Sequence, residues 1–158
     1  MKKIAIICAL AGAATIAMPA SAQPSTSANP NYGTINLEAG FNNDPRVIRV
    51  VSGGQTSAAS VGRNCAGWVS RASDVRLNYE AGGSLPLIIS AASSDDTTLV
   101  VNGPDGRWYC DDDGGENGLN PSVRFNNPQS GRYEIWVGSY REGQNSEARL
   151  HISEISSQ

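Results

Sequence analysis

The sequence predicts an all-β fold, an antiparallel β-sandwich of about eight or nine strands. Short runs rich in β-branched and aromatic residues alternate with turns that contain Gly, Asn, Asp and Pro. Glycine is abundant, at 17 of 158 residues, and from residue 32 onward no segment keeps the period of an amphipathic helix. Several short strands separated by turn signals at regular spacing are typical of a sandwich or a barrel.

Four strands are expected in the first part of the chain. Residues 32–38 lead into a G-F-N-N-D-P turn, and residues 46–52 follow that turn and end at a Gly-Gly pair. Residues 75–80 alternate apolar and polar side chains, as a strand with one buried face does. Residues 85–91 are almost continuously apolar, which favours a central strand buried on both faces. Residues 55–73 show no clear period, and we expect one short strand there, held by a disulfide.

Five further strands are expected in the second part. Residues 97–101 and 107–110 flank a G-P-D-G turn and predict a hairpin. Residues 122–125 precede an N-N-P turn. Residues 132–140 form the strongest run, because alternate positions carry large apolar side chains. Residues 148–155 close the domain, again with alternate apolar residues pointing inward.

The N-terminus has the pattern of a cleavable signal peptide, which we expect at residues 1–22. Lys2 and Lys3 precede an apolar stretch, and an A-S-A sequence stands directly before Gln23. At about 15 residues the apolar stretch is shorter than the roughly 20 that a spanning helix needs. We therefore expect a periplasmic or secreted protein with a flexible leader at residues 23–31, one sandwich domain at residues 32–158 and no membrane span after cleavage.

The charge of the expected mature part excludes some classes of partner. Without the first 22 residues the chain keeps ten basic residues, all Arg, against fifteen acidic ones. A mildly acidic domain without basic clusters is a poor nucleic-acid binder, because neutralisation of phosphates dominates that affinity. The composition therefore predicts no nucleic-acid partner.

Two cysteines remain after the expected cleavage, Cys65 and Cys110. In an oxidising compartment the simplest prediction is one disulfide between them. Two free, buried thiols are the alternative. A zinc site is not expected, because two Cys and one His without neighbours at metal spacing make a poor ligand set.

Acidic residues give the main candidate ligand site. They are Asp95, Asp96, Asp111, Asp112 and Asp113, with Glu116, Asn117 and Asn120 as further oxygen donors. If the G-P-D-G turn places residue 102 opposite residue 107, then Leu99 faces Cys110, Thr97 faces Asp112 and Asp96 faces Asp113. Like charges that face each other across strands are destabilising, and a calcium ion with six to eight oxygen ligands would offset that repulsion. A solvated acidic loop is the alternative.

Four sequence stretches together resemble a known family. They are D-T-T-L-V-V at residues 96–101, P-D-G-R-W-Y-C-D-D-D at 104–113, N-P-S-V at 120–123 and S-G-R-Y-E-I-W-V-G-S-Y at 130–140. In this order they resemble the bacterial pre-peptidase C-terminal domain, a family similar to the collagen-binding modules of bacterial collagenases. The resemblance covers residues 75–154 and leaves residues 32–73 outside.

The resemblance implies a jelly-roll-like β-sandwich that is not itself catalytic. Some members of the family bind calcium through acidic loops, and such modules usually sit beside a secreted protease or another enzyme. The expected function is therefore an exported, non-catalytic binding or structural module that calcium stabilises.

Two other functions are alternatives to this one. A small secreted hydrolase is the less favoured, because His151 is the single histidine and no nucleophile elbow is present. A carbohydrate- or cell-surface-binding module is the stronger alternative, with Trp108, Trp136 and Tyr140 as candidate stacking faces. These aromatic residues would otherwise close the ends of the sandwich. The expected partner is a protein or a polysaccharide at the cell envelope.

Overall fold

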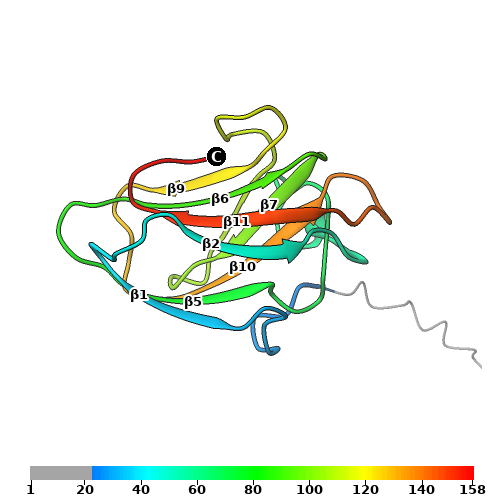
Figure 1. The fold of residues 1–158 in the computed structure, drawn as a ribbon. Helices are drawn as coiled ribbons and strands as arrows, with labels where there is room; N and C mark the ends of the chain where they lie inside the picture. Colours follow the sequence, from blue (N-terminus) through cyan, green and yellow to red (C-terminus); the bar gives the residue numbers. More distant parts are fainter. Residues whose placement is uncertain (1–22) are drawn as a thin grey trace, which may run out of the picture.

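The computed structural model describes residues 23–158, and two β-sheets packed face to face form this part of the chain (Figure 1). The strands are β1 (Thr34–Glu38), β2 (Arg46–Val51), β3 (Thr56–Ser57), β4 (Trp68–Val69), β5 (Val75–Glu80), β6 (Leu87–Ser93), β7 (Thr97–Asn102), β8 (Trp108–Asp111), β9 (Ser122–Phe125), β10 (Gly131–Ser139) and β11 (Glu147–Ser153). One 3₁₀ turn, Ala58–Ser60, accompanies them. The predicted all-β sandwich is confirmed. The signal peptide expected at residues 1–22 lies outside the described residues, and no helix within residues 23–158 is long and apolar enough to cross a membrane.

The two sheets differ in size. The larger has seven strands in the order β1-β5-β10-β4-β3, with β7 also paired to β10 and β8 paired to β7. The smaller has four strands in the order β2-β11-β6-β9. All pairs are antiparallel except β1 and β5, which run parallel with Thr34 opposite Arg76. The chain visits β2 in the other sheet between these two strands, and a long connection of this kind allows parallel pairing.

The nine strands expected from the sequence all form, and their ends differ from the expected ones by at most two residues. Residues 55–73 contain two short strands, β3 and β4, where one was expected. These two strands pair with each other, and β4 meets the end of β10 at Ser139.

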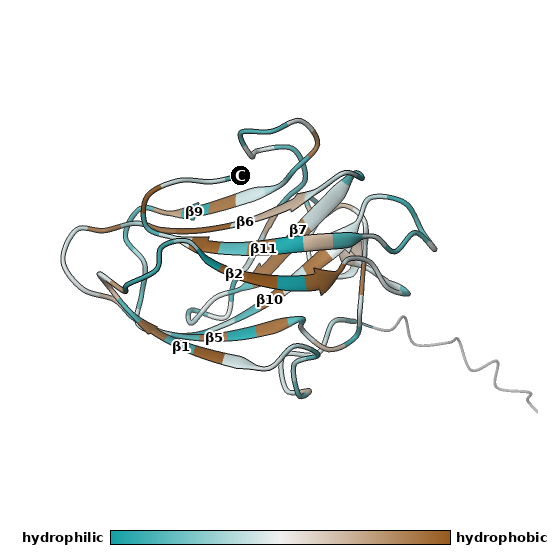
Figure 2. Cartoon of the chain, viewed as in Figure 1, coloured by the Kyte–Doolittle hydropathy of each residue, from teal (hydrophilic) through white to brown (hydrophobic). Residues whose placement is uncertain are grey.

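Alternation along the strands builds the core between the sheets. In β5 the side chains of Val75, Leu77 and Tyr79 are buried while those between them are more exposed. Figure 2 shows hydrophobic and hydrophilic positions following one another along the strands. Residues 87–91 of β6 are buried on both faces, as the continuous apolar run predicted. The inner face packs in the core, and on the outer face the N–H of Gln158 donates to Oγ of Ser90 at 3.2 Å.

A second, smaller core lies on the outer face of the seven-stranded sheet. Residues 55–73 cover this face, and Trp136 of β10 is fully buried there with Ala58, Val69 and Val100. The predicted disulfide between Cys65 and Cys110 is confirmed, and it joins the covering segment to β8. The disulfide thus holds a segment with little regular secondary structure against the sheet.

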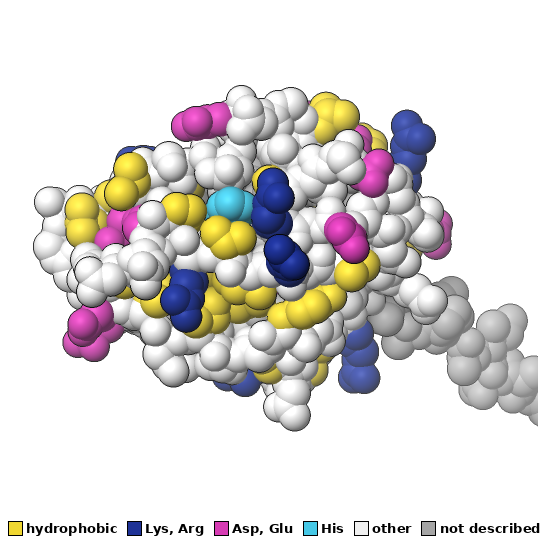
Figure 3. Space-filling view, in the orientation of Figure 1, with side chains coloured by type: hydrophobic (Ala, Val, Ile, Leu, Met, Phe, Trp, Pro, Cys, Tyr) yellow, Lys and Arg dark blue, Asp and Glu magenta, His cyan; other side chains and the backbone are white. Residues whose placement is uncertain are grey.

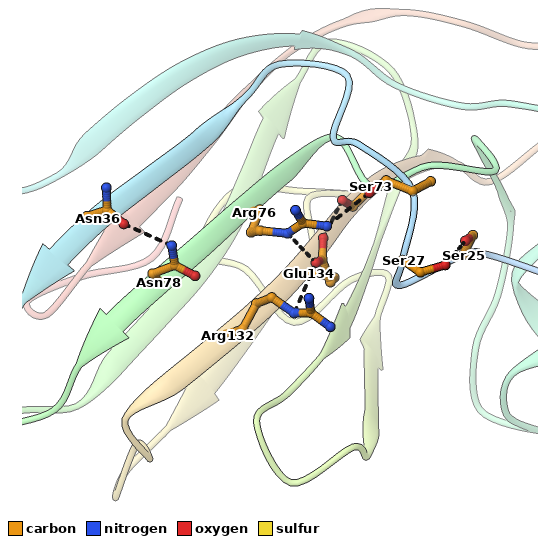
Figure 4. Close-up of polar contacts among 9 residues, drawn as sticks. Ser25, Ser27, Asn36, Ser73, Arg76, Asn78, Arg132 and Glu134 are labelled. Atoms are coloured by element: carbon orange, nitrogen blue, oxygen red, sulfur yellow. Dashed lines mark hydrogen bonds and ion pairs between the residues drawn. The ribbon is translucent and has the colours of Figure 1, made fainter.

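The N-terminal segment at residues 23–31, expected to be a flexible leader, is hydrogen-bonded to the domain. The N–H of Ser25 donates to the carbonyl of Arg71, and Nη2 of Arg76 donates to the carbonyl of Ala28 at 2.9 Å. Arg76 in turn donates through Nε to the buried carboxylate of Glu134 at 2.5 Å (Figure 4). A charged network therefore lies between this segment and the sheet.

The buried carboxylate of Asp74 accepts a backbone hydrogen bond from β10 where a strand partner is missing. Asp74 accepts the N–H of Val137 through Oδ2 at 2.7 Å, at the point where the pairing of β10 with β5 has ended. Burial raises the pKa of Asp74 to about 6, although its hydrogen bonds from Val137 and Asn31 oppose the rise. The folded state therefore holds a proton on Asp74 over a pH range in which the unfolded chain does not.

The disulfide should make a large contribution to stability. A closed loop of 45 residues corresponds to about 4 kcal/mol on the loop-entropy model. We expect Cys65→Ser combined with Cys110→Ser to lower the melting temperature on the order of 10 °C. Thermal melts with and without a reducing agent measure this, and the double variant should be insensitive to the reducing agent. An equal melting temperature for the wild type and the double variant would contradict the expected role.

Asp74 should make stability fall as the pH rises. Because its pKa is near 3.8 when unfolded and about 6 when folded, the wild type should lose up to about 3 kcal/mol relative to Asp74→Asn between pH 4 and pH 7. Urea unfolding of both proteins at several pH values measures the difference. Asp105→Asn is the control. Because the hydroxyl of Tyr109 lowers the pKa of Asp105, the stability of the wild type relative to this variant should rise, not fall, as the pH rises. A pH-independent difference between wild type and Asp74→Asn would show that Asp74 does not titrate as stated.

Candidate functional site

The hairpin of β7 and β8 brings the two acidic segments to one end of the sandwich, but in a different register from the one expected. Leu99 lies opposite Asp111 and Val100 lies opposite Cys110, so the expected pairing of Leu99 with Cys110 is wrong by one residue. The N–H of Gly106 donates to the carbonyl of Gly103, and Gly106 has a φ of 75°. A three-residue loop with a left-handed glycine adds one residue to the turn, which shifts every pair.

The carboxylate of Asp111 is occupied by backbone donors. Its Oδ2 accepts the N–H of Gly114 at 2.7 Å and the N–H of Ser122 at 2.8 Å. A Cβ at position 114 would lie 2.7 Å from the same carboxylate, so this close approach requires glycine. Asp111 therefore organises the loop between β8 and β9.

Asp112 and Asp113 act electrostatically on Asp96, although the three carboxylates do not form a metal-binding group. Burial raises the pKa of Asp96, and the carboxylates of Asp113 and Asp112 raise it further, while Arg141 opposes the rise. Oδ1 of Asp96 is buried and has no hydrogen-bond partner within residues 23–158. Asp95 is exposed in the connection between β6 and β7, where its N–H donates to Oγ of Ser93.

The remaining predicted ligands have other roles or point to solvent. Asn120 is buried, and its Oδ1 accepts the N–H of Ser93 at 3.0 Å. Glu116 is exposed, and its N–H donates to the carbonyl of Gln158. Across residues 23–158 no group of three or more His, Cys, Asp or Glu side chains is arranged to hold a metal ion. The acidic residues predicted as ligands therefore do not form one ready metal site, and calcium binding stays a prediction.

The three candidate stacking residues have different environments. Trp136 is fully buried, with its ring centroid 5.4 Å from that of the partly buried Trp108. Trp136 therefore cannot offer a face to a ligand, because residues 55–73 cover the sheet above it. Tyr140 is 48% exposed at the end of β10. The sequence did not show that residues 55–73 cover the outer face of the seven-stranded sheet at Trp136.

His151 lies on the outer face of the four-stranded sheet, between Val47 of β2 and Ser90 of β6. It is 7% exposed, and among the described residues neither of its ring nitrogens has a hydrogen-bond partner. Burial lowers the pKa of His151, and Arg149 nearby lowers it further. The imidazole is therefore neutral at pH 7 and is not oriented by a carboxylate or a hydroxyl, as a catalytic base would be.

Two arginines lie side by side on the same face. Arg49 of β2 is directly opposite Arg149 of β11, and both side chains are exposed. Within residues 23–158 neither guanidinium makes a hydrogen bond or lies within 4.0 Å of a carboxylate. Figure 3 shows basic side chains together beside the histidine, with hydrophobic side chains below them in this view. We call Arg49 and Arg149 the arginine pair.

A shallow hollow of about 860 Å³ adjoins the arginine pair. Its lining is mixed, with both arginines, the acid Glu147, the polar Ser93 and Asn120, and the aromatic ring of Tyr32. Val47 and Val51 of β2 are 44% and 49% exposed on the same face as Arg49. The face thus combines two arginines without an ion pair within 4.0 Å, exposed apolar side chains and hydrogen-bonding groups, which suit a protein surface.

This face was not predicted from the sequence. Arg49 and Arg149 stand in two expected strands, but they are 100 positions apart, and only the pairing of β2 with β11 places them together. The signal that was present is alternation, since each arginine occupies the polar side of its strand. Strand order could not be read from alternation alone.

The chain has little likeness to known proteins. No protein-family model and no curated protein matches it. Among solved structures, it is similar to PliG of Aeromonas hydrophila, a periplasmic lysozyme inhibitor of g-type lysozyme, with a TM-score of 0.37 and 14% identity over 80% of this chain and 98% of that chain. A likeness at this level carries no inference about function, so the proposals below depend on the geometry of this chain.

Proposed function

We propose that this chain is an exported, non-catalytic module that binds a protein partner on the outer face of its four-stranded sheet. The observation that carries the proposal is the arginine pair, which is exposed and has no acidic partner within residues 23–158. Two like charges directly opposite each other on a sheet are unfavourable, and an acidic group from a partner would reverse the sign of this interaction.

The surroundings of the arginine pair favour a protein over a small ligand. Val47, Val51 and Tyr32 are exposed around it, and aromatic and apolar side chains next to Arg are typical of protein interfaces. The hollow beside the pair is shallow and polar, unlike the enclosed, mostly apolar clefts that hold small molecules.

A binding role without catalysis agrees with the rest of the molecule. His151 has no oriented partner, and Asp74 and Glu134, the buried carboxylates near β10, are engaged with backbone or arginine donors. The pre-peptidase C-terminal resemblance, which we retain as a proposal, also implies a module that assists another protein.

Selection from a random peptide library on the immobilised protein tests the proposed function. We expect the selected peptides to be enriched in Asp and Glu, because they must neutralise the arginine pair. Their affinity should fall at least tenfold for the variant that combines Arg49→Thr with Arg149→Thr, as measured by calorimetry.

The matched control is Arg63→Thr, which changes an arginine in the loop before Cys65 and should leave affinity unchanged. The double variant should be at least as stable as the wild type, since it removes a like-charge pair worth roughly 0.2–1 kcal/mol. Selected peptides without acidic enrichment, or equal affinity for the wild type and the double variant, would refute the proposed function.

Calcium binding at the acidic loop is a second proposal. It is supported by Asp96, whose buried Oδ1 has no hydrogen-bond partner among the described residues and whose neighbours are the carboxylates of Asp112 and Asp113. Calcium takes oxygen ligands, and carboxylates are its usual ones in proteins. Arg141 supplies part of the compensating charge in the absence of an ion.

Thermal melts in chelator and in millimolar calcium test this second proposal. A hundredfold excess of calcium over Kd would add about 2.7 kcal/mol and raise the melting temperature by several degrees. Asp112→Asn combined with Asp113→Asn should abolish the rise, and it spares Asp111, which holds the loop. Magnesium should have a smaller effect, because it demands tighter geometry. Identical wild-type melts in both buffers would show that the loop is only a solvated acidic loop.

A further inference from the structure

β2 is an open edge of the four-stranded sheet. Among the described residues β11 is its one strand neighbour. The N–H of Ser52 donates to the carbonyl of Ser146, so the alternation of an antiparallel ladder directs the backbone groups of Val47, Arg49 and Val51 away from β11. The N–H of Val51 does point outward, because it donates to the hydroxyl of Tyr32 at 2.8 Å.

The rest of this edge is available to another strand. Tyr32 occupies the end at Val51, whereas Val47 and Arg49 present backbone N–H and C=O groups without a strand partner. A row of such groups is a template for pairing with another chain. β2 is entirely made of Arg, Val and Ile, so it contains no proline that would interrupt a new ladder.

A hollow of about 450 Å³ lies beside the same edge, between β1 and β2. Its lining is mixed: Pro45 and the partly buried Ile35 and Ile48, which pack against the core, are apolar, whereas Thr34 and Asn43 are polar. A strand added to β2 would direct every second side chain into this hollow, since successive side chains point to opposite faces. Those positions of the partner should therefore be apolar.

The other face of an added strand would meet the arginine pair. A residue directly opposite Arg49 would lie on the outer face, next to a guanidinium that has Arg149 on its other side. Opposite charges at facing positions stabilise a strand pair, and like charges destabilise it. The partner residue opposite Arg49 should therefore be Asp or Glu.

We propose that β2 accepts an extended segment of a partner protein by antiparallel strand addition, with an acidic residue opposite Arg49 and apolar residues on either side of it entering the hollow between β1 and β2. This inference rests on the proposed function and names its partner: a strand with the pattern apolar-acidic-apolar. Main-chain hydrogen bonds give the affinity in this mode, and alternate side chains give the specificity. A second copy of this chain is disfavoured, because it would bring its own Arg46 and Arg49 to an edge that already carries the arginine pair.

Synthetic seven-residue peptides test the inference directly. The reference peptide has Glu at its centre, Val on both sides of it and Thr elsewhere. In antiparallel addition the amide of the Glu opposite Arg49 donates to β2, and the amides of the adjacent Val residues point away. N-methylation of the Glu amide should therefore weaken binding at least tenfold, whereas N-methylation of an adjacent Val amide should have little effect. A peptide with Lys in place of Glu should also bind at least tenfold more weakly.

Two protein variants complete the experiment. Val47→Pro removes an outward N–H at an edge position that tolerates proline, and it should weaken binding of the reference peptide at least tenfold. Val47→Thr keeps the backbone donor, so it should lose much less affinity than Val47→Pro does. Titrations followed by ¹⁵N NMR measure the affinities, and the amide resonances of Val47 and Arg49 should shift in the wild type.

The outcomes separate the two proposals. If the two N-methylated peptides bind alike, or Val47→Pro has no effect, strand addition is refuted, while acidic enrichment in the library selection would leave the proposed function intact. Absence of binding by the reference peptide likewise overturns the inference. Sedimentation of the wild type as a dimer that Val47→Pro dissociates would make a second copy the occupant and also overturn it.

Discussion

The backbone of β10 must be fully hydrogen-bonded, because this strand is buried at the centre of the seven-stranded sheet. One edge of β10 pairs with β7, but the other edge pairs with β5 only as far as Ile135 and with β4 only at Ser139. The gap is closed by Asp74, whose carboxylate accepts the N–H of Val137, and by Gly53, whose N–H donates to the carbonyl of Val137. A Cβ at Gly53 would lie 2.4 Å from a backbone oxygen, so glycine is required there. The strand order of the larger sheet therefore depends on one carboxylate and one glycine between strands.

The outer faces of the two sheets are covered to different extents. On the larger sheet, residues 55–73 bury Trp136, and residues 23–31 lie over the Glu134 network, in which a buried carboxylate has Arg76 as its charge partner. A buried charge without its partner is strongly destabilising, so this network holds the N-terminal segment in one arrangement. On the smaller sheet the residues after β11 cover β6 at Ser90. The surface over β2 and the adjoining part of β11 stays open, and that is where the arginine pair lies.

Local patterns predicted the elements well and their partners poorly. Alternation and turn residues located nine strands to within two residues, because a strand with one buried face has apolar residues at every second position of its own sequence. The register of the β7–β8 hairpin was wrong, because the left-handed Gly106 adds a residue that composition does not reveal. The prediction of Trp136 as a candidate stacking face was wrong, because nothing in its own strand indicates that residues 55–73 cover it. The disulfide followed from cysteine number alone, whereas the arginine pair required a strand pairing over 100 positions.

The arginine pair and the open edge of β2 are explained by the same argument. An exposed edge strand invites unwanted pairing, and charged side chains on that edge discourage it. Arg49 alone would serve this purpose, yet Arg149 stands directly opposite and makes the pair repulsive by roughly 0.2–1 kcal/mol. A second arginine therefore adds little protection and lowers stability slightly. It does increase the attraction of an acidic strand, because a carboxylate beside Arg49 would lie in the field of two positive charges. Selective binding of an acidic segment accounts for both arginines. Protection of the edge against unwanted strand pairing accounts for only one.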